Sequence, residues 1–595
     1  MQEHVNFDGA NKNLQNLDNQ LSASFNTANI SQAEGNTKSR VVRETDVQNN
    51  IGDDELDLAE RLGDAHLNIL PTKKMIVCLA TMSLGLFISF VDQTGITIAL
   101  PHIAKDLNAE TTINWAGTSS LLANCVCQVL VGRFADIFGR KTVLLYSFFL
   151  LAVADLACGL AKTGVQFFIF RACCGIANGG IQLLTNIIIS DIVVLKKRAK
   201  YYGILSSSIG LANCTGPLIL AGFIKGSSWR TFYYIMPAIC FLVAIIIYFV
   251  VNKNRKDKQE VLSRREKFKK IDYLGFIFSS AGLILLLIPI SGGGSTYKWN
   301  SGLIIAMFIV GGLCLIGFLL IEWKIPRLPM IPLGLFKSGL LSLVLSTNFL
   351  YGMTYYSFTY YVPYYFQIVR GYDSIMASVL LIPLVLMQAI NSIISGQIIS
   401  YTGHYKHVIL FGYGSWVLSC GLLLLWSETI NIGVVIVVLL IMGVGLGFTF
   451  QPCMVAAQAQ AKKSERAVVI GTRNVIRSFG GAIGIAMGSL IVSNTLLKEI
   501  NEALVHKEKY ANIPTDYLNY LKLHIYTRIE VTGLNEKQVK VIKSMYMKSL
   551  MNYFYLGIPL IGICFISSFF LKDRGVQCID EQPEPKDKEK DITSK

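Results

Sequence analysis

Charged side chains are scarce in this sequence. Only 16% of its 595 residues are Asp, Glu, Lys or Arg, whereas 52% are hydrophobic, and the mean hydropathy is +0.48. Soluble domains carry about 25% charged residues, because their surfaces must be solvated by water. The composition therefore excludes a soluble multidomain enzyme and favours a protein embedded in a membrane.

Motifs for covalent chemistry are also missing. The sequence has no Gly-rich phosphate-binding loop, no nucleophile motif and no cluster of His and Cys at metal-ligand spacing. Most of the 13 cysteines lie in apolar runs, where we expect them to pack as small apolar side chains. We therefore predict no enzyme activity, no metal, no cofactor and no direct coupling to ATP, which leaves a proton gradient as the expected energy source.

Residues 1–72 lack both apolar stripes and a signal-peptide pattern. This stretch is polar and rich in Asn and Ser, with no basic region followed by an apolar run. Such a composition buries too little apolar surface to fold, so we predict a disordered tail. The first apolar segment is then expected to direct membrane insertion itself.

Long apolar runs are abundant in the rest of the sequence. A helix needs about 20 apolar residues to cross a hydrocarbon core of roughly 30 Å. Such windows lie at 75–98, 114–132, 142–161, 165–190, 200–223, 231–252, 273–290, 301–321, 340–362, 374–398, 408–427, 430–450, 467–494 and 550–571. Because an unpaired backbone amide in lipid costs several kcal/mol, and barrel-type alternation is absent, each window is predicted to be a helix. The expected fold class is an all-α polytopic membrane protein with 14 transmembrane helices.

The net charge of +15 falls mainly on one side of this predicted topology. The short loops on that side carry most of the Lys and Arg, above all the loop 253–270. This asymmetry predicts that both termini are cytosolic, and that the basic loop contacts anionic lipid rather than nucleic acid. The long segment 495–549 then lies on the far side, where its run NEKQVKVIKSMYMKSL is expected to form an amphipathic helix on the membrane surface.

One inner loop combines charge with glycine. The stretch GRFADIFGRK, from Gly132 to Lys141, joins the second and third windows. Its glycines, Gly132 and Gly139, allow a tight bend and close helix approach, and Asp136 can pair with a cation or a helix N-terminus at the membrane edge. The alternative is a positive-inside anchor, formed by Arg140 and Lys141, that happens to contain glycines.

The pattern G-x-x-x-D-x-x-G-R-K in this loop resembles the signature of the major facilitator superfamily. VDQTGITIALPHIAKDL at 91–107, FIFRACCGIANGG at 168–180 and GTRNVIRSFGGAIG at 471–484 are similar to other landmarks of its fourteen-span, drug:proton antiporter branch as fungi use it. The match covers about residues 70–495. The resemblance implies two six-helix halves plus two extra central helices, around a cavity that opens alternately to each side.

On this basis the chain divides into six segments. They are a cytosolic tail at 1–72, an N-terminal half at 73–252, a basic cytosolic linker at 253–272, the extra helix pair at 273–322, a C-terminal half at 323–571 with the non-cytosolic loop 495–549, and a cytosolic tail at 572–595. The expected partners are the lipid bilayer, protons and a small organic solute, and the chain is expected to be a monomer.

The fifth window carries an imperfect version of the branch's antiporter motif. The motif reads roughly G-x8-G-x3-G-P-x2-G-G, and this chain offers Gly203, Ala212, Gly216, Pro217 and Gly222. A glycine-rich run around a proline gives a helix that can kink and pack closely on its neighbour. Because the Gly-Pro core remains, the resemblance still implies proton exchange, while uniport or another coupling stays open.

Ionisable residues inside the windows are rare and therefore informative. A charge near the bilayer centre costs at least roughly 2.5–3.5 kcal/mol on insertion scales. Asp92, Asp155 and Arg171 nevertheless fall at similar depth in the first, third and fourth windows. An Asp that changes protonation as the cavity opens can carry the proton, with Arg171 tuning its proton affinity. A static ion pair that fixes packing and a direct contact with solute are the alternatives.

The inner ends of the windows supply a second candidate site. Asp191 ends the fourth window level with Asp136 and Arg140, and the resemblance implies a cytosolic latch that locks the two halves and opens when they rock. The predicted latch comprises Gly132, Asp136, Gly139, Arg140, Lys141 and Asp191.

Polar side chains inside other windows are candidates for the cavity wall. They are Gln128, Asn178, Gln182, Asn348, Tyr356, Arg473 and Arg477. The two arginines either snorkel to the inner surface or line the cavity. The Tyr-rich ninth window suits cation–π contacts with solutes, and equally plain helix packing or an interfacial aromatic belt.

Three classes of function remain. The first is a proton-coupled antiporter that exports drug-like or toxic organic compounds. The second is an importer of basic amino acids into the vacuole, a function that related fungal proteins of this branch have. The third is a non-transporting receptor or scaffold. Asp92, Arg171 and the inner-loop motif argue against the third. A span of about 20 residues fits either membrane, so vacuole and plasma membrane both stay open, with the plasma membrane favoured.

Overall fold

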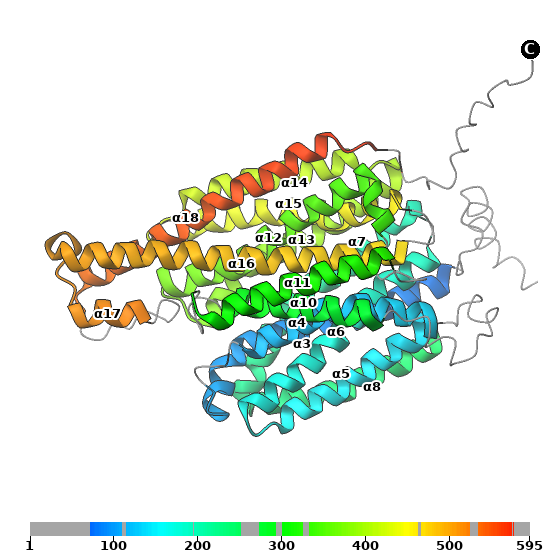
Figure 1. Cartoon of the computed structure of the whole chain (residues 1–595), viewed down its shortest axis with the longest axis horizontal. Helices are drawn as coiled ribbons and strands as arrows, with labels where there is room; N and C mark the ends of the chain where they lie inside the picture. Colours follow the sequence, from blue (N-terminus) through cyan, green and yellow to red (C-terminus); the bar gives the residue numbers. More distant parts are fainter. Residues whose placement is uncertain are drawn as a thin grey trace, which may run out of the picture.

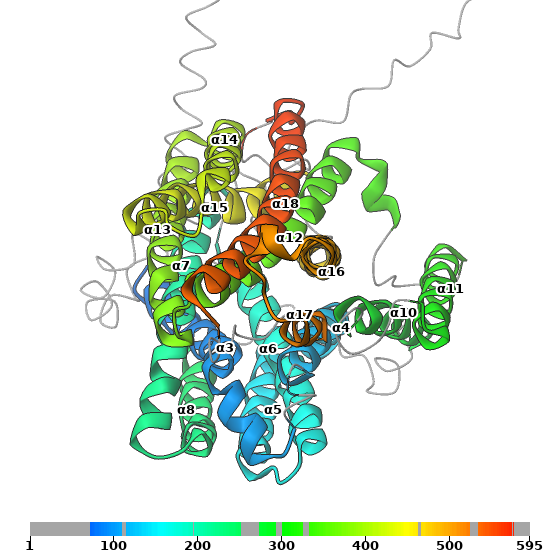
Figure 2. The same ribbon diagram turned by 90° about the vertical axis from the view of Figure 1, so that its left-hand side faces the viewer.

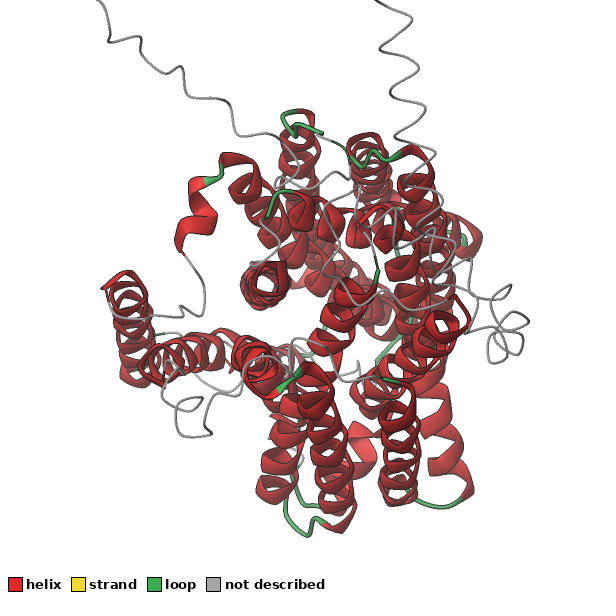
Figure 3. Cartoon of the chain, turned by 90° about the vertical axis from the view of Figure 1, so that its right-hand side faces the viewer, coloured by secondary structure: helices red, strands yellow, loops and turns green. Residues whose placement is uncertain are grey.

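The computed structural model describes residues 72–109, 113, 115–193, 195–251, 273–292, 300–324, 333–461, 466–523, 534–573 and 575. All regular structure in these residues is helical, which confirms the all-α fold class (Figure 3). The predicted linker 253–272 lies outside the described residues, and so does nearly all of the predicted tails 1–72 and 572–595.

Each predicted window overlaps a long helix in the described residues. These helices are α3 (Thr72–Asp106), α4 (Trp115–Phe138), α5 (Arg140–Leu160), α6 (Gly164–Ile192), α7 (Leu195–Gly226), α8 (Trp229–Val250), α10 (Tyr273–Gly292), α11 (Gly302–Lys324), α12 (Gly339–Tyr364), α13 (Ser374–Thr402), α14 (Lys406–Leu422), α15 (Ile432–Ala459), α16 (Arg466–Val505) and α18 (Glu536–Phe569). A helix satisfies its own backbone amides, which is why apolar runs adopt it in lipid.

Eleven helices in the described residues are long and apolar enough to cross a membrane. Helices α4, α10 and α12 are not among them. In α12, Tyr, Thr and Asn interrupt the apolar residues, and the apolar stretch of α10 is short, Tyr273–Pro289. The count of 14 transmembrane helices therefore stays a prediction.

The helices form two groups that lie side by side (Figure 1). Helices α3 to α8 make up the N-terminal group, and α12 to α16 with α18 make up the C-terminal group. Between the groups, α7 lies beside α13 and α4 lies beside α16. Helices α10 and α11 form a hairpin at the edge of the body, where α10 contacts both α4 and α16 (Figure 2). Any movement of one group against the other must therefore act on these contacts.

The segment predicted to lie on the membrane surface belongs to a transmembrane helix instead. NEKQVKVIKSMYMKSL forms the first turns of α18, which continues without a break into the last window. Its apolar side chains, among them Ile542, Met545 and Tyr546, are buried, and α18 packs along α16. The spacing of three and four residues thus reflects packing between helices. Beyond α16, the short helices η7 (Lys507–Tyr510) and α17 (Thr515–Leu523) lie at the same end of the body (Figure 1).

The predicted sidedness can be tested with single cysteines in a variant without native cysteines. Glu508 and His407 are both exposed, in η7 and at the start of α14. If the N-terminus is cytosolic, Glu508→Cys is expected to react with a membrane-impermeant thiol reagent added outside intact cells, and His407→Cys is expected to react only after permeabilisation. For a protein in an organelle membrane, the same comparison is made on isolated organelles, whose outer face is cytosolic. The reverse pattern would overturn the assigned orientation.

Candidate functional site

Buried charged side chains meet where α3, α5 and α6 pack together. Asp92 and Arg171 are each 0% exposed. Arg171 Nη1 donates to Asp92 Oδ1 at 2.6 Å, and Asn178 Nδ2 donates to Asp92 Oδ2 at 2.7 Å. Ser89 holds the amide in turn, because its hydroxyl donates to Asn178 Oδ1 at 2.8 Å. Asp92 is therefore an ion-paired carboxylate with both oxygens hydrogen-bonded, as a charge in this setting requires.

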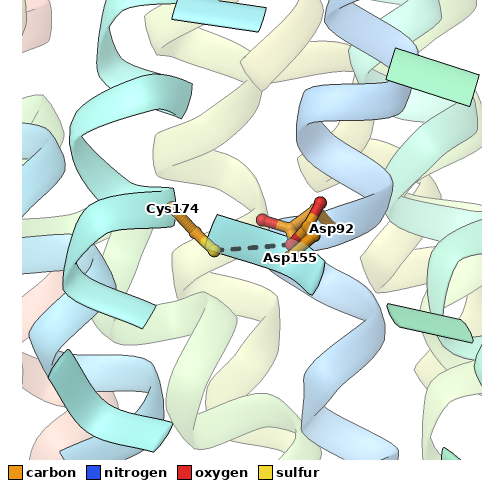
Figure 4. A group of neighbouring side chains, drawn as sticks. All are labelled: Asp92, Asp155 and Cys174. Carbon is orange, nitrogen blue, oxygen red and sulfur yellow. Dashed lines mark hydrogen bonds between the residues drawn. The ribbon is translucent and has the colours of Figure 1, made fainter. Parts of the chain in front are cut away.

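Asp155 lies next to this ion pair but is poorly bonded itself (Figure 4). Cys174 Sγ donates to Asp155 Oδ1 at 3.4 Å, while Asp155 Oδ2 is buried without a hydrogen-bond partner in the part of the chain that is described. One carboxylate oxygen of Asp92, one of Asp155 and the Cys174 sulfur lie within 4.8 Å of one another. Two carboxylates and one guanidinium have a net charge of −1, which one bound proton neutralises. Asp155 is the carboxyl group that has an oxygen without a hydrogen-bond partner among the described residues. The cluster therefore has one carboxyl group more than it has guanidinium groups.

A metal ion fits this cluster poorly. Asp92, Asp155 and Cys174 resemble a ligand set, but Arg171 and Asn178 already occupy both oxygens of Asp92. A cation would have to displace the guanidinium and would leave it buried without its partner, which is costly. The arrangement favours a proton over a metal at this place.

The structure gives Asn178 and Cys174 roles that differ from those expected. Asn178, a candidate for the cavity wall, is 0% exposed and is bonded to Asp92 and Ser89. Cys174, expected only to pack, donates to Asp155. The spacing of Arg171, Cys174 and Asn178 could have predicted that all three side chains face the same cluster, because residues three and four apart share one face of a helix.

Two residues of the predicted latch form an ion pair in the part of the chain that is described. Arg140 Nε lies 2.5 Å from Asp191 Oδ2, and both side chains are about a quarter exposed. Lys141 belongs to a different contact, because its Nζ donates to the Tyr248 carbonyl oxygen at 2.6 Å and lies 4.7 Å from the centre of the Tyr248 ring. The side chain of Asp136 is outside the described residues. The ion pair joins α5 to α6, so it links helices of the N-terminal group and not the two groups.

The two glycines of the latch differ in what they do. Gly139 separates α4 from α5 and has φ 92°, a left-handed conformation that favours glycine. A Cβ at Gly132 would lie 3.3 Å from Leu183 Cδ2, so the absence of a side chain there lets α4 approach α6 closely. Both glycines thus shape the loop and its neighbours.

A second set of residues at this end joins the two groups. Arg198 on α7 donates through Nε to the Val193 carbonyl at 2.8 Å and through Nη1 to Gln458 Oε1 on α15 at 3.3 Å. Gln458 Nε2 donates to the Tyr202 hydroxyl at 3.0 Å. Arg198, Tyr202 and Gln458 are buried. We call these three residues, with Gly203 and Gly396, the inner gate.

The glycines of the inner gate bring α7 and α13 into backbone contact. A Cβ at Gly203 would lie 2.5 Å from the Ser392 carbonyl oxygen, and a Cβ at Gly396 would overlap the Ala199 carbonyl oxygen. Of the other motif residues, Gly216 packs α7 on α3, since a Cβ there would lie 2.6 Å from Thr94 Oγ1. A Cβ at Gly222 would meet no atom within 4 Å, so this glycine makes no close helix contact in this conformation. Pro217 lies inside α7, where a kink is expected.

Two buried arginines lie on α16 in the C-terminal group. Arg473 Nη2 donates to the Phe450 carbonyl oxygen at 2.7 Å, and its guanidinium lies 5.4 Å from the Phe450 ring centre. The Arg477 guanidinium lies 4.8 Å from the same ring and 6.0 Å from that of Tyr356. Because the two arginines are only 1% and 8% exposed, they do not snorkel to the surface. Asn348 supports them by donating to the Arg473 carbonyl oxygen at 2.8 Å.

Several buried polar atoms in the described residues have no hydrogen-bond partner. Gln128 donates to Asn124 Oδ1 at 2.6 Å, but its own Oε1 is unpaired, and so is Gln182 Nε2. The same holds for Asn348 Oδ1, Gln451 Oε1 and the hydroxyl of Tyr351. Unpaired buried polar atoms are rare in proteins and mark places where water or a ligand completes the bonding.

The Arg140–Asp191 pair is expected to affect function more than stability. Because both side chains are partly exposed, Arg140→Ala should lower the free energy of unfolding by no more than about 1 kcal/mol. If the pair fixes α5 against α6 as the inner end opens, the transport rate should fall, and the charge swap Arg140→Asp with Asp191→Arg should restore part of it. Transport rates of these variants are compared with that of the wild type in reconstituted vesicles. Lys141→Ala is the control for loss of a positive charge. An unchanged transport rate in Arg140→Ala would contradict a role of the ion pair in transport and would indicate that Arg140 only fixes the membrane topology.

The family of the protein follows from comparison with known sequences. Residues 82–485 match the sequence profile of the Major Facilitator Superfamily. The chain is 39% identical over 528 residues to citrate exporter 1 of Yarrowia lipolytica, which covers 88% of this chain and 76% of that protein. It is 33% identical over 435 residues to the efflux pump dotC of Dothistroma septosporum, and the alignment covers 73% of this chain and 74% of that protein. The chain belongs to the Major Facilitator Superfamily and is a multi-pass integral membrane transporter.

Solved structures share the fold at low sequence identity. The human organic anion transporter TETRAN aligns with a TM-score of 0.53 and 12% identity, covering 82% of this chain and 99% of that one. A proton:xylose symporter aligns with a TM-score of 0.50 and 13% identity, covering 86% and 99%. At such identity the likeness shows the fold alone.

Proposed function

We propose that this transporter exports small organic solutes in exchange for protons, as a member of the drug:proton antiporter branch. The observation that carries the proposal is the buried cluster of Asp92, Asp155 and Arg171, which has one carboxyl group more than it has guanidinium groups. Such a cluster, within one of two groups of helices that rock against each other, can bind a proton from one side and release it to the other.

Small organic acids are the favoured class of solute. The relative from Yarrowia lipolytica, named a citrate exporter, aligns with 88% of this chain at 39% identity. Drug-like compounds are the second candidate, because the chain also resembles a protein named an efflux pump. Both names describe outward movement, which supports export and, with it, a place in the plasma membrane.

Import of basic amino acids is the weaker alternative. Arg473 and Arg477 are buried close to the interface between the groups, and no acidic partner pairs with either of them in the described residues. A cationic solute passing this point would meet two like charges at low dielectric, which is unfavourable. The geometry therefore favours a neutral or anionic solute.

The energetics suit export of an organic acid. A pH difference of one unit supplies about 1.4 kcal/mol per proton, and a potential of 100 mV, negative inside, supplies roughly 2.3 kcal/mol for each charge moved. Inward movement of a proton and outward movement of an anion both gain from that potential. Proton exchange with a solute of even one negative charge can therefore sustain a solute gradient on the order of a thousand-fold or more.

Efflux from cells tests the proposal and separates the two classes of solute. Cells expressing the protein, and matched cells without it, are loaded with labelled citrate or with a cationic dye. The protein is expected to speed the loss of citrate, and a protonophore is expected to slow it. Faster loss of the dye alone would favour drug export. Equal loss of both compounds with and without the protein at the cell surface would contradict the proposal.

The location of the protein is a separate test. Export to the medium requires the plasma membrane, so a fluorescent tag at the C-terminus is expected to label the cell surface. A label confined to the vacuolar rim would contradict release into the medium and favour transport into the vacuole.

A further inference from the structure

Two cations face the same side of α16 without a counter-charge. Arg473 and Arg477 are four residues apart, so their side chains lie on one face of the helix, where like charges repel each other. They lie roughly 10 and 16 Å along the helix axis from its start at Arg466, within the apolar stretch Val468–Val505, which is long enough to cross a membrane. In the described residues no carboxylate is within ion-pair distance of either guanidinium. Buried charges are normally paired, so this arrangement lacks an anion.

The bonding around the pair is also incomplete. The Nε atoms of Arg473 and Arg477 are buried and have no hydrogen-bond partner. The one hydrogen bond from either guanidinium in the described residues goes from Arg473 to the Phe450 carbonyl oxygen. A guanidinium offers five N–H donors in a fork that matches a carboxylate. Most of these donors are therefore available to a ligand with several oxygen acceptors.

Aromatic rings set the position of the two guanidiniums. Phe450 lies under both of them, at 5.4 and 4.8 Å, and Tyr356 lies 6.0 Å from Arg477. The Tyr351 ring is 6.1 Å from Phe450, and its hydroxyl is unpaired. Rings stacked on a guanidinium hold its plane in place without neutralising it. The rings thus hold the pair in orientation and supply no counter-charge.

The pair lies where the two groups of helices meet. Val475, which lies between the two arginines on α16, belongs to a buried apolar cluster at this interface. Around them, α4 and α16 pack through Cys125, Val126 and Val475, with Leu283 and Leu287 of α10 alongside. In this fold the solute binds at the interface between the halves, near the middle of the bilayer. A ligand on these arginines would therefore contact the surface that separates when the groups move.

We propose that Arg473 and Arg477 form an anion-binding subsite that selects solutes with two or more carboxylate groups. A dicarboxylate or tricarboxylate can place one carboxylate on each guanidinium, whereas a monocarboxylate leaves one cation unpaired. The proposal deepens the proposed export of organic acids by naming the residues that recognise them. Binding itself needs no proton movement, so the subsite can be tested apart from coupling.

The first test is binding to the full-length protein in nanodiscs of neutral lipid. Citrate and succinate are expected to raise the thermal denaturation midpoint in a saturable way, acetate much less and lysine not at all. Discs that contain anionic lipid distinguish a second source of the same chemistry, since a lipid phosphate on the pair would compete with citrate. Stabilisation by anionic lipid with no effect of citrate in neutral discs would overturn the proposal, and so would equal stabilisation by acetate and citrate.

Variants assign the binding to the two arginines. Arg473→Gln and Arg477→Gln are each expected to weaken citrate binding by about ten-fold to a hundred-fold, because a charge-assisted hydrogen bond is lost. Arg477→Lys keeps the positive charge but loses the paired N–H donors of the guanidinium. Its affinity for citrate should therefore lie between those of the wild type and Arg477→Gln. Lys498→Gln, which removes an exposed cation from the same helix, is the control and should bind as the wild type does.

The outcomes separate the subsite from the proposed function. Citrate affinity that persists in the double variant Arg473→Gln with Arg477→Gln overturns the subsite even if transport is proton-driven. Citrate binding that depends on both arginines supports the subsite even if a pH gradient drives no transport, in which case only the coupling fails. If a variant does not fold, the ranking of citrate, succinate, acetate and lysine on the wild type decides.

Discussion

Replacing Asp155 with asparagine is expected to abolish proton-driven accumulation of solute in reconstituted vesicles while leaving downhill exchange intact. Asparagine has the same shape and can still accept the hydrogen bond from Cys174, but it cannot take up and release a proton. The accumulation ratio should fall from its wild-type value to about one, because no other group in the cluster has an unoccupied carboxylate oxygen. Accumulation that persists in Asp155→Asn would exclude this residue as the proton carrier.

Asp92→Asn is the matched comparison, since it changes the other carboxyl group of the same cluster. Asp92 accepts from Arg171 and Asn178, so its loss leaves a buried guanidinium without its partner. That should cost about 3–5 kcal/mol of folding free energy. Asp155→Asn removes a poorly bonded carboxyl group and should change stability much less. Thermal denaturation therefore separates the ion pair from the proton carrier, and equal loss of stability in both variants would contradict this division of roles.

Gly396→Ala is expected to stop transport by keeping α7 and α13 apart. A Cβ at Gly396 overlaps the Ala199 carbonyl oxygen, a backbone atom that cannot rotate away. Overpacking of this kind costs about 1–3 kcal/mol, which shifts the balance between a closed and an open inner gate by roughly ten-fold to a hundred-fold. The protein should still fold, because in the open state the helices separate and accommodate the methyl group.

Cysteine accessibility measures that shift directly. Ser206 is buried beside Ser392 across the α7–α13 contact, with 3.3 Å between the hydroxyl oxygens. In a variant without native cysteines, Ser206→Cys should react slowly with a reagent applied from the cytosolic side, and faster when Gly396→Ala is added. Gly222→Ala is the control, since a Cβ there meets nothing within 4 Å. Equal labelling in all three proteins would show that these glycines do not set the gate.

The helices could be predicted from sequence because the membrane leaves an apolar run little choice. A span must satisfy its own amides, so the apolar windows sufficed to locate the long helices from α3 to α16 and α18, but not the short α17. The hydropathy of a helix does not indicate which other helices it packs against. The start of α18 shows an amphipathic spacing that suits a membrane surface equally well, and only the burial of Ile542, Met545 and Tyr546 reveals that the stripe packs inside the protein.

The site was only partly predictable for a related reason. Asp92, Asp155 and Arg171 stood out because a charge within an apolar window is expensive, and the structure places all three within one buried cluster. Arg198 did not stand out, since a cation at an inner loop is what the positive-inside pattern expects. Its partner Gln458 lies 260 residues away, and no local pattern links the two. The structure was needed to find the inner gate.

Simultaneous measurement of proton and solute movement tests the central claim most directly. The full-length protein is reconstituted into sealed vesicles with an acidic lumen, and labelled citrate and luminal pH are followed together. Citrate is expected to accumulate against its gradient as the lumen loses protons, and a protonophore is expected to abolish the accumulation. Asp155→Asn should exchange citrate without moving protons. Citrate accumulation that continues at full rate with no proton movement would contradict proton-coupled export by this transporter.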